Sequence, residues 1–262
     1  MNLQGHSKRI IVALIAVPLL LFIIIKLPPY FFLGLLVLTN TIAFWEFLRM
    51  YNTLKLLSFT GIFISIIIFA LNCFYWQFAV YYYSLSFIFI ALIRLFLKKQ
   101  PEGSLKDLAP VIVGLLYIPG LLVFHWFLRA EGWQWIIYLY SVVWASDSFA
   151  YYIGKGFGKS KLYPEVSPKK TWAGAYGSIA GGAVTSLAVG YLIVNKSIVS
   201  LVLMGGIIGF VSILGDLVES MFKRDAGVKD SSFLFPEHGG VLDKIDAMLF
   251  AGVILYFVLK YM

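Results

Sequence analysis

Residues 220–246 read SMFKRDAGVKDSSFLFPEHGGVLDKID and carry ten charged or titratable side chains where two strongly apolar stretches meet. The apolar stretches are Ile198–Val218 and Leu242–Lys260, and each is long enough to cross a bilayer, because a spanning helix needs about 20 mainly apolar residues. Ionisable groups beside lipid are costly unless they are paired, hydrated or bound to a metal. We therefore interpret residues 220–246 as the functional centre of a membrane protein.

The composition assigns the whole chain to the same class. Of its 262 residues, 61% are hydrophobic and 13% are charged, whereas soluble proteins have about 45–50% apolar and about 25% charged residues. The sequence predicts an all-α, polytopic integral membrane protein with about nine transmembrane helices. The predicted spans are Ile10–Leu27, Tyr30–Leu48, Leu56–Asn72, Phe78–Leu97, Leu108–Leu128, Trp133–Ile153, Trp172–Val194, Ile198–Val218 and Leu242–Lys260.

The basic residues predict the orientation, because cytoplasmic loops carry an excess of Lys and Arg. With nine spans, sixteen of the 21 Lys and Arg residues fall on the side of the N-terminus and four on the other side. We therefore expect a cytoplasmic N-terminus, in the inner membrane. Topology and contact with anionic lipid account for the net charge of +8, so no nucleic-acid partner is predicted. Lys8 and Arg9 would also suit a signal peptide, but no small-residue cleavage site follows, and we expect a retained helix.

The chain divides according to where its polar chemistry lies. Residues 1–72 hold three predicted spans with little polar chemistry, and we interpret them as a scaffold or dimerisation part. Residues 73–132 form a middle part with two spans, and residues 133–262 hold four spans with long basic loops and intramembrane acids. We expect the last part to be catalytic. The single cysteine, Cys73, excludes a disulfide framework within one chain and suits a buried packing role.

Two glycine pairs lie in the predicted spans of the catalytic part. Gly177 and Gly181 are four residues apart, and so are Gly205 and Gly209. Small residues at this spacing let helices approach closely in lipid. Close helix packing is the favoured prediction, and the alternative is that the glycines make room for a lipid chain or a broken helix.

Carboxylates gather at one membrane boundary. Asp243 and Asp246 are three residues apart at the start of the last span, so both project from one face of a helix. Asp216 and Glu219 have the same spacing at the end of the eighth span, and Asp147 ends the sixth at the same level. Carboxylates without cysteine or paired histidine suit a hard cation such as Mg²⁺. We predict a metal site from Asp147, Asp216, Asp243 and Asp246; the alternative is a set of ordinary ion pairs with neighbouring Lys and Arg.

A basic, glycine-rich stretch accompanies the acids. Residues 152–172 read YIGKGFGKSKLYPEVSPKKTW. Glycines bring backbone N–H groups close to phosphate oxygens, and Lys or Arg neutralises the phosphates. Together with Lys223, Arg224 and Lys229, this stretch predicts a polyphosphate cradle that faces the metal. A solvated basic loop is the alternative.

Two further motifs fail on spacing. Gly158-Lys159-Ser160 resembles the end of a P-loop, but Ile153 stands where the first glycine should be. His238-Gly239-Gly240 resembles an oxyanion-hole motif, yet the chain has no G-x-S-x-G nucleophile elbow. P-loop kinases and hydrolases of this type are therefore excluded.

Three blocks resemble the phosphatidate cytidylyltransferases, also called CDP-diacylglycerol synthases. The most specific block is Ser220-x-x-Lys223-Arg224-x4-Lys229-Asp230, followed by His238-Gly239-Gly240-x-x-Asp243-x-x-Asp246. The others are Asp147 with Ala150-Tyr151 and Gly154-Lys155, and Phe157-Gly158-Lys159 through Ser167-Pro168-x-Lys170-Thr171-Trp172. Two positions depart from the pattern. Lys244 stands where the family usually has arginine. Lysine keeps the positive charge but cannot form the two parallel hydrogen bonds of a guanidinium group. Ser146 stands where a small apolar residue is common.

The resemblance implies transfer of the cytidylyl group of CTP to phosphatidic acid, which yields CDP-diacylglycerol and pyrophosphate. It implies that the reaction requires Mg²⁺, as one or two cations, and takes place at a site that faces the cytoplasm. It also implies a homodimer. The residues it implicates in catalysis are Asp243, Asp246, Lys223, Arg224 and His238, and those for substrate binding are Lys155, Lys159, Ser167, Lys170, Thr171, Lys229, Asp230, Lys244, Gly239 and Gly240.

The mechanism we expect from this resemblance needs no protein nucleophile. The phosphate of phosphatidic acid attacks the α-phosphorus of CTP in line, one or two divalent cations bridge the phosphates, and catalysis consists mainly of positioning and charge neutralisation. His238 would orient a phosphate or act as an acid. Two rivals stay open: a CTP-dependent lipid kinase, which would move the γ-phosphate, and an ion-coupled transporter, whose acids would lie near the bilayer midplane between related halves.

Overall fold

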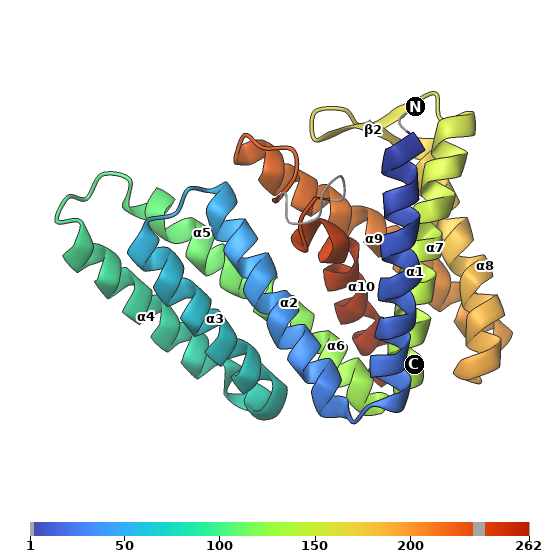
Figure 1. Ribbon diagram of the computed structural model, residues 1–262, viewed down its shortest axis with the longest axis horizontal. Helices are drawn as coiled ribbons and strands as arrows, with labels where there is room; N and C mark the ends of the chain where they lie inside the picture. Colours follow the sequence, from blue (N-terminus) through green and yellow to red (C-terminus); the bar gives the residue numbers. More distant parts are fainter. Residues whose placement is uncertain (1–2, 233–238, 262) are drawn as a thin grey trace. The chain divides into compact units, whose positions relative to one another are not determined.

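A computed structural model describes residues 3–232 and 239–261, with side chains described at Leu14 and from Ala16 onward. Within that range, five helical stretches are long and apolar enough to cross a membrane: Pro29–Met50, Lys55–Leu97, Ser104–Glu131, Trp172–Ile193 and Ile198–Asp225. The prediction of an all-α membrane protein is confirmed (Figure 1). The count of about nine spans and the orientation of the N-terminus stay predictions.

The helices follow the predicted spans closely. They are α1 (Leu3–Lys26), α2 (Pro29–Met50), α3 (Lys55–Tyr75), α4 (Ala79–Leu97), α5 (Ser104–Tyr117), α6 (Pro119–Glu131), α7 (Trp133–Phe157), α8 (Trp172–Ile193), α9 (Ile198–Asp225) and α10 (Leu242–Tyr261), with a short 3₁₀ helix, η1 (Trp76–Phe78). The fifth predicted span is divided into α5 and α6 at Pro119. Proline has no N–H to donate and disfavours a helical conformation of the residue before it, which explains the break at Ile118.

The chain forms two compact units. The N-terminal unit consists of Met1–Trp126 and Asp230–Asp243, and the C-terminal unit consists of Phe127–Lys229 and Lys244–Met262. The segment Asp230–Asp243 therefore packs with helices that precede it by more than a hundred residues. The three-part division at residues 72 and 132 stays a prediction.

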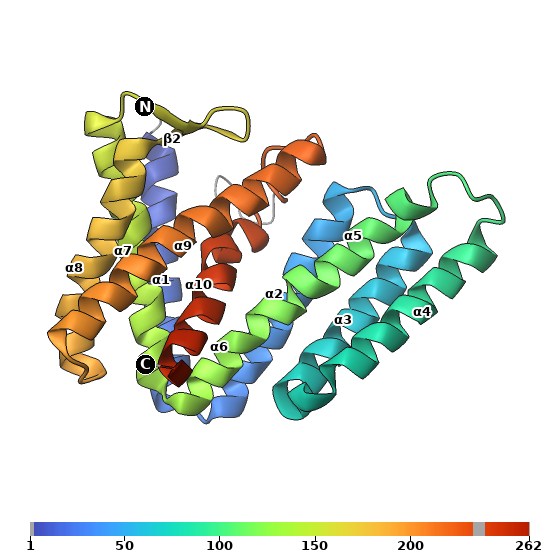
Figure 2. The same ribbon diagram turned by 180° about the vertical axis from the view of Figure 1, so that it is seen from behind.

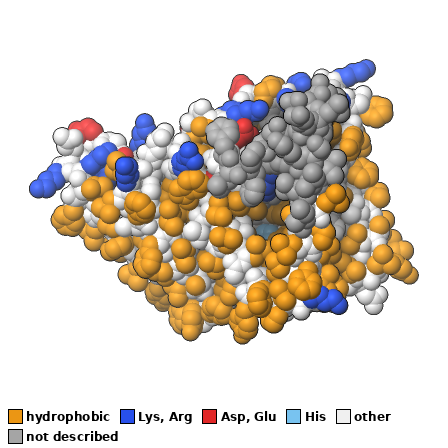
Figure 3. Space-filling view, viewed as in Figure 1, with side chains coloured by type: hydrophobic (Ala, Val, Ile, Leu, Met, Phe, Trp, Pro, Cys, Tyr) orange, Lys and Arg blue, Asp and Glu red, His pale blue; other side chains and the backbone are white. Residues whose placement is uncertain are grey.

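In the N-terminal unit, α2, α3, α4 and α5 lie side by side (Figures 1 and 2). Gly114 of α5 lets the ring of Phe44 approach, since an added Cβ would lie 3.0 Å from that ring. The outer surfaces of α3 and α4 carry exposed apolar side chains such as Phe59, Tyr81 and Phe96. Figure 3 shows these apolar surfaces, with Lys and Arg gathered at the end of the unit where α4 connects to α5. An apolar belt below a basic edge is typical of a membrane protein.

One buried arginine orders the connection between α4 and α5. The Arg94 side chain is almost fully buried, and its Nε donates to Asp107 Oδ2 at 2.6 Å. Its terminal nitrogens donate to the backbone carbonyls of Lys98, Gln100 and Glu102 at 2.9–3.2 Å. Buried charges are tolerated when they are paired and hydrogen-bonded. This connection is therefore built around Arg94, although its composition alone is typical of a solvated loop.

In the C-terminal unit, α8 packs between α7 and α9 through small residues (Figures 1 and 2). A Cβ added at Gly182 would collide with the carbonyl oxygen of Gly205, and one added at Gly205 would collide with that of Gly182. Gly209 likewise lies against the backbone of Ser178, whose hydroxyl donates to the Gly209 carbonyl at 2.9 Å. Gly177 and Gly181 lie equally close to Ile153 and Phe149 of α7. The prediction of close helix packing at both glycine pairs, Gly177 with Gly181 and Gly205 with Gly209, is confirmed.

This packing predicts unequal effects of alanine at two adjacent glycines. Gly205→Ala would force α8 and α9 apart, and we expect it to destabilise the protein by about 1–3 kcal/mol. The matched control is Gly206→Ala, because the nearest atom to its added Cβ is Ile179 Cγ2 at an ordinary 3.7 Å. The thermal unfolding midpoint in detergent should fall for Gly205→Ala and hold for Gly206→Ala. Equal midpoints for the two variants would contradict the close approach.

A short β-hairpin stands where the sequence predicts an irregular basic loop. Strand β1 (Lys161–Tyr163) pairs antiparallel with β2 (Ser167–Thr171), with Lys161 opposite Thr171 and Tyr163 opposite Ser167. Thr171 then caps α8, because its hydroxyl accepts a hydrogen bond from the Gly174 N–H at 3.1 Å. The hairpin and the cap together fix the backbone on both sides of Lys170.

Candidate functional site

Three carboxylates from three helices interact within the C-terminal unit. Asp147 lies on α7, Asp216 on α9 and Asp246 on α10, and the charge of Asp216 acts on both Asp147 and Asp246. Gly215 makes the approach of α10 possible, since a Cβ there would lie 2.7 Å from the backbone oxygen of Asp246 and 3.0 Å from the Cα of Ala247. The backbone therefore brings these acids to one place.

Lys170 supplies the positive charge beside them. Its Nζ lies 2.7 Å from Asp216 Oδ2, and its charge also acts on Asp147. The contact is an ion pair and not an aligned hydrogen bond, because the buried Nζ atom has no acceptor in line. Asp216 also accepts a hydrogen bond from the Ser220 hydroxyl at 3.2 Å. For Asp216, the ion pair that the sequence left open as an alternative is thus present.

The donor chemistry of this cluster fits a hard divalent cation. Asp147 is exposed and the side chain of Asp216 keeps 39% of its surface accessible, so solvent reaches both. Mg²⁺ is usually bound by one or two carboxylates, several waters and substrate phosphates, and does not need a cage made of protein alone. Among the described residues, no three His, Cys, Asp or Glu side chains are arranged to hold a metal ion by themselves, so a cation here would need further ligands. The chemistry of the three acids therefore suits an open cation site, and the binding of a cation there stays a prediction.

Two predicted phosphate ligands on α9 make structural contacts. Lys223 is buried and pairs with the fully buried Glu219 one helical turn earlier, and its charge also acts on Asp246. Arg224 donates from Nε to the Val166 carbonyl at 3.3 Å and from a terminal nitrogen to the Val228 carbonyl at 2.9 Å. Arg224 thereby ties the hairpin to the end of α9. The phosphate-binding roles of both residues stay predictions.

The remaining predicted substrate ligands differ in exposure. Ser167 is half-buried and pairs with Tyr163 in the hairpin, and Thr171 is buried as the cap of α8. His238 lies outside the described residues. The exposed members are Lys155, Lys159, Lys229, Asp230 and Lys244. Exposure leaves these cations and Asp230 accessible to a soluble substrate, and their roles stay predictions.

Asp243 belongs to the N-terminal unit and lies in the first turn of α10. Its Oδ2 accepts hydrogen bonds from the N–H of Ser231 at 3.0 Å, the hydroxyl of Ser231 at 2.7 Å and the N–H of Gly240 at 2.7 Å. Gly239 has φ +77°, a left-handed conformation that favours glycine, and a Cβ there would lie 2.5 Å from Asp243 Oδ2. These contacts show that Asp243 and Gly239 stabilise the local backbone. The predicted role of Asp243 in cation binding and that of Gly239 in substrate binding stay predictions.

Glu46 contacts the residues on both sides of this loop, and the sequence analysis did not single it out. It lies on α2, is fully buried, and accepts hydrogen bonds from Ser231, Ser232, Val241 and Leu242. One signal was available: Glu46 is the acidic residue within the predicted span Tyr30–Leu48. An ionisable residue inside a spanning helix marks a functional site by default.

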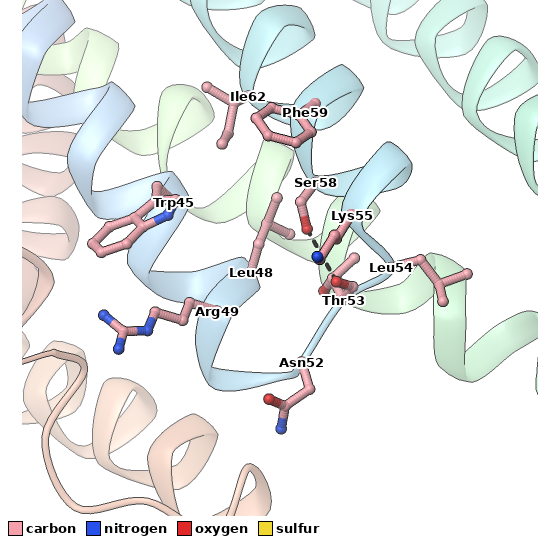
Figure 4. A pocket seen from close by; sticks show the side chains of 10 residues that line it. All are labelled: Trp45, Leu48, Arg49, Asn52, Thr53, Leu54, Lys55, Ser58, Phe59 and Ile62. Carbon is pink, nitrogen blue, oxygen red and sulfur yellow. Dashed lines mark hydrogen bonds between the residues drawn. The ribbon is translucent and has the colours of Figure 1, made fainter.

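A cavity of about 700 Å³ lies in the N-terminal unit between the end of α2 and the start of α3 (Figure 4). Ten residues line it: Trp45, Leu48, Arg49, Asn52, Thr53, Leu54, Lys55, Ser58, Phe59 and Ile62. Its lining contains none of the predicted site residues. The predicted chemistry is therefore not placed in this cavity.

Comparison with known proteins identifies relatives across the chain. The model of the cytidylyltransferase family matches residues 7–262. A phosphatidate cytidylyltransferase of Staphylococcus haemolyticus is 34% identical over 214 residues, which cover 80% of this chain and 82% of the relative. The enzyme of the same name from Staphylococcus aureus is 38% identical over 163 residues, or 62% of each chain. That of Haemophilus influenzae is 48% identical over 122 residues, which span 43% of this chain and 41% of the relative.

Proposed function

Because the chain belongs to the cytidylyltransferase family and is similar to proteins named phosphatidate cytidylyltransferase, we propose that it transfers the cytidylyl group of CTP to phosphatidic acid. The products are CDP-diacylglycerol and pyrophosphate. The observation that carries this assignment is the cluster of Asp147, Asp216 and Asp246 with Lys170, because a reaction between two polyanions needs bound positive charge at the reacting phosphates.

The substrates require a site that is open to both water and lipid. CTP is soluble and phosphatidic acid is held in a leaflet, so the site belongs at a membrane boundary. We place it on the cytoplasmic side of an inner membrane crossed about nine times, with a cytoplasmic N-terminus. The basic-residue distribution supports this topology. The helices α1 to α10 support it as well, because they follow the nine predicted spans when α5 and α6 are taken as one. A homodimer remains part of the proposal on the family resemblance alone.

The site residues act by placing positive charge beside the phosphates of CTP. Asp147, Asp216 and Asp246 would hold a Mg²⁺ ion, which when bound neutralises the phosphates of CTP. Lys170 exchanges its contact with Asp216 for a phosphate oxygen, and the buried Lys223 adds positive potential beside Asp246. The phosphate of the lipid is itself the nucleophile, and the oxygen it contributes displaces pyrophosphate from the α-phosphorus. Catalysis then rests on orientation and on electrostatic stabilisation of the transition state.

Isotopic labelling of CTP tests this function. Purified protein in detergent is incubated with phosphatidic acid, Mg²⁺ and CTP labelled with ³²P at either the α- or the γ-phosphate. We expect label in the lipid fraction from α-labelled CTP and none from γ-labelled CTP, with pyrophosphate released. Lipid label from γ-labelled CTP would instead identify a CTP-dependent lipid kinase. No lipid label from either nucleotide would contradict the proposal.

A further inference from the structure

We infer that Glu46 is a positioning residue, which fixes Ser231, Ser232 and the start of α10 and thereby sets the placement of Asp243. This inference rests on the proposed function, because it concerns the helix that carries Asp243 and Asp246. It gives a task in the reaction to the N-terminal part of the chain, for which the sequence predicted only a scaffold.

The carboxylate of Glu46 is saturated by donors from one distant segment. Oε1 accepts from the Ser232 hydroxyl at 2.6 Å and from the Val241 N–H at 3.0 Å, and Oε2 accepts from the Leu242 N–H at 2.8 Å and the Ser231 hydroxyl at 3.3 Å. All four donors lie 185–196 residues further along the chain. The side chain is 0% exposed. The single proton of the Ser231 hydroxyl is shared with Asp243, so Glu46 has three full donors and one shared donor. Because the side chain is buried, its partners do not exchange these hydrogen bonds with bulk solvent, and it fixes them more firmly than a solvated carboxylate would.

Two of these donors belong to the start of α10. The first N–H groups of a helix have no partner within the helix and carry its positive dipole end. Leu242 is the first residue of α10 and Val241 precedes it, and both direct their N–H groups to Glu46. Glu46 therefore caps α10 from another helix. Without Glu46, the buried Leu242 N–H and the part-buried Val241 N–H would lose this acceptor.

Ser231 links Glu46 to Asp243. Its hydroxyl lies 2.7 Å from Asp243 Oδ2 and 3.3 Å from Glu46 Oε2, and its backbone N–H also donates to Asp243. Gly240 completes the arrangement, since an added Cβ would collide with both the Ser231 hydroxyl and Glu46 Oε1. We therefore expect a shift of Glu46 to move Ser231 and Gly240, which donate hydrogen bonds to Asp243. This close approach also gives Gly240 a packing reason to be glycine.

Hydrogen exchange tests the positioning directly and needs no substrate. Glu46→Gln keeps one acceptor oxygen, and Glu46→Ala keeps none. We expect exchange at Val241 and Leu242 to accelerate by about tenfold or more in Glu46→Ala and by less in Glu46→Gln, since a hydrogen bond to a charged group is worth about that factor. The matched control is Asn40→Ala, which removes an equally buried polar side chain of α2 that contacts Ser65 instead. Protection that is unchanged in both Glu46 variants, or lost equally in Asn40→Ala, would overturn the inference.

Steady-state kinetics supply the second measurement. The family resemblance implicates Asp243 in catalysis. Its displacement should therefore lower kcat by about tenfold or more in Glu46→Gln while the KM for phosphatidic acid changes little, because the lost effect is one of orientation. Ser232→Ala, which removes one donor, should lower kcat in the same direction and should have little further effect in the Glu46→Gln background. If Glu46→Ala does not fold, Glu46→Gln and Ser232→Ala carry both measurements. Additive losses in the double variant would overturn the coupling.

The two measurements separate this inference from the proposed function. A wild-type protein that forms no labelled lipid would defeat the proposed function, whereas the exchange data would still decide whether Glu46 holds the start of α10. Conversely, an active wild type with unchanged exchange in the Glu46 variants would defeat the inference alone.

Discussion

Asp246→Asn should reduce the formation of CDP-diacylglycerol by about 10²–10³-fold or more, in line with the loss of a group that stabilises transition-state charge. Asp246 interacts with Asp216 and Asp147, and its place on α10 is fixed by the close approach of Gly215. Asparagine has the same shape but lacks the charge and the second strong acceptor that a Mg²⁺ site uses. The rate of label transfer from α-labelled CTP at saturating Mg²⁺ measures the effect.

The fold should survive this substitution. Removing one of three mutually repelling carboxylates relieves repulsion, so the unfolding midpoint should hold or rise. Glu131→Gln is the matched control, because Glu131 forms a surface ion pair with Lys260 at 2.6 Å outside the cluster. That variant should retain nearly full activity. Near-normal turnover in Asp246→Asn would show that the cluster is not the reaction centre.

Lys170→Gln should be the second severe variant, with an expected loss in kcat of about 10²-fold or more. The reason is its position: the hairpin and the Thr171 cap fix the backbone around Lys170, and its Nζ lies 2.7 Å from Asp216. Lys170→Arg keeps the charge and should retain part of the activity, although the guanidinium geometry differs. Lys169→Gln is the matched control, since Lys169 is the adjacent, exposed lysine of β2.

A double variant separates two roles of Lys170. If Lys170 serves only as the counter-ion of Asp216, combining Lys170→Gln with Asp216→Asn should recover activity relative to Lys170→Gln alone. If Lys170 binds phosphate and Asp216 binds the cation, as we propose, the double variant should be no more active than either single variant. Recovery of activity would therefore contradict the role of Lys170 in phosphate binding.

The helices of the predicted spans could be predicted most accurately from the sequence. A helix in lipid satisfies its own backbone hydrogen bonds and must be apolar over its full length, so the hydropathy of each segment determines its structure locally. The division at Pro119 has a local cause as well, although the apolar pattern continues across it. The β-hairpin was missed because Lys161–Thr171 is rich in lysine and proline, and no apolar alternation marks its strands.

The site was predictable where chemistry is local and not where it depends on distant contacts. The spacing of Asp243 and Asp246 on one helix is a local property, and so is the position of Asp216 near the end of the predicted span Ile198–Val218. The contact of Glu46 with Ser232 joins residues 186 apart in sequence, and nothing in either neighbourhood indicates the other. Arg94 is similar, because its three backbone acceptors become visible only when the loop is folded around it.

Binding of Mn²⁺, a paramagnetic substitute for Mg²⁺, tests the carboxylate cluster most directly. Electron paramagnetic resonance counts the free ion in a titration of purified protein with CTP present, for the wild type and for the double variant Asp216→Asn with Asp246→Asn. We expect the wild type to bind at least one Mn²⁺ that the double variant does not bind, while both keep the same unfolding midpoint. Equal binding by the two proteins would contradict the claim that these carboxylates hold the cation.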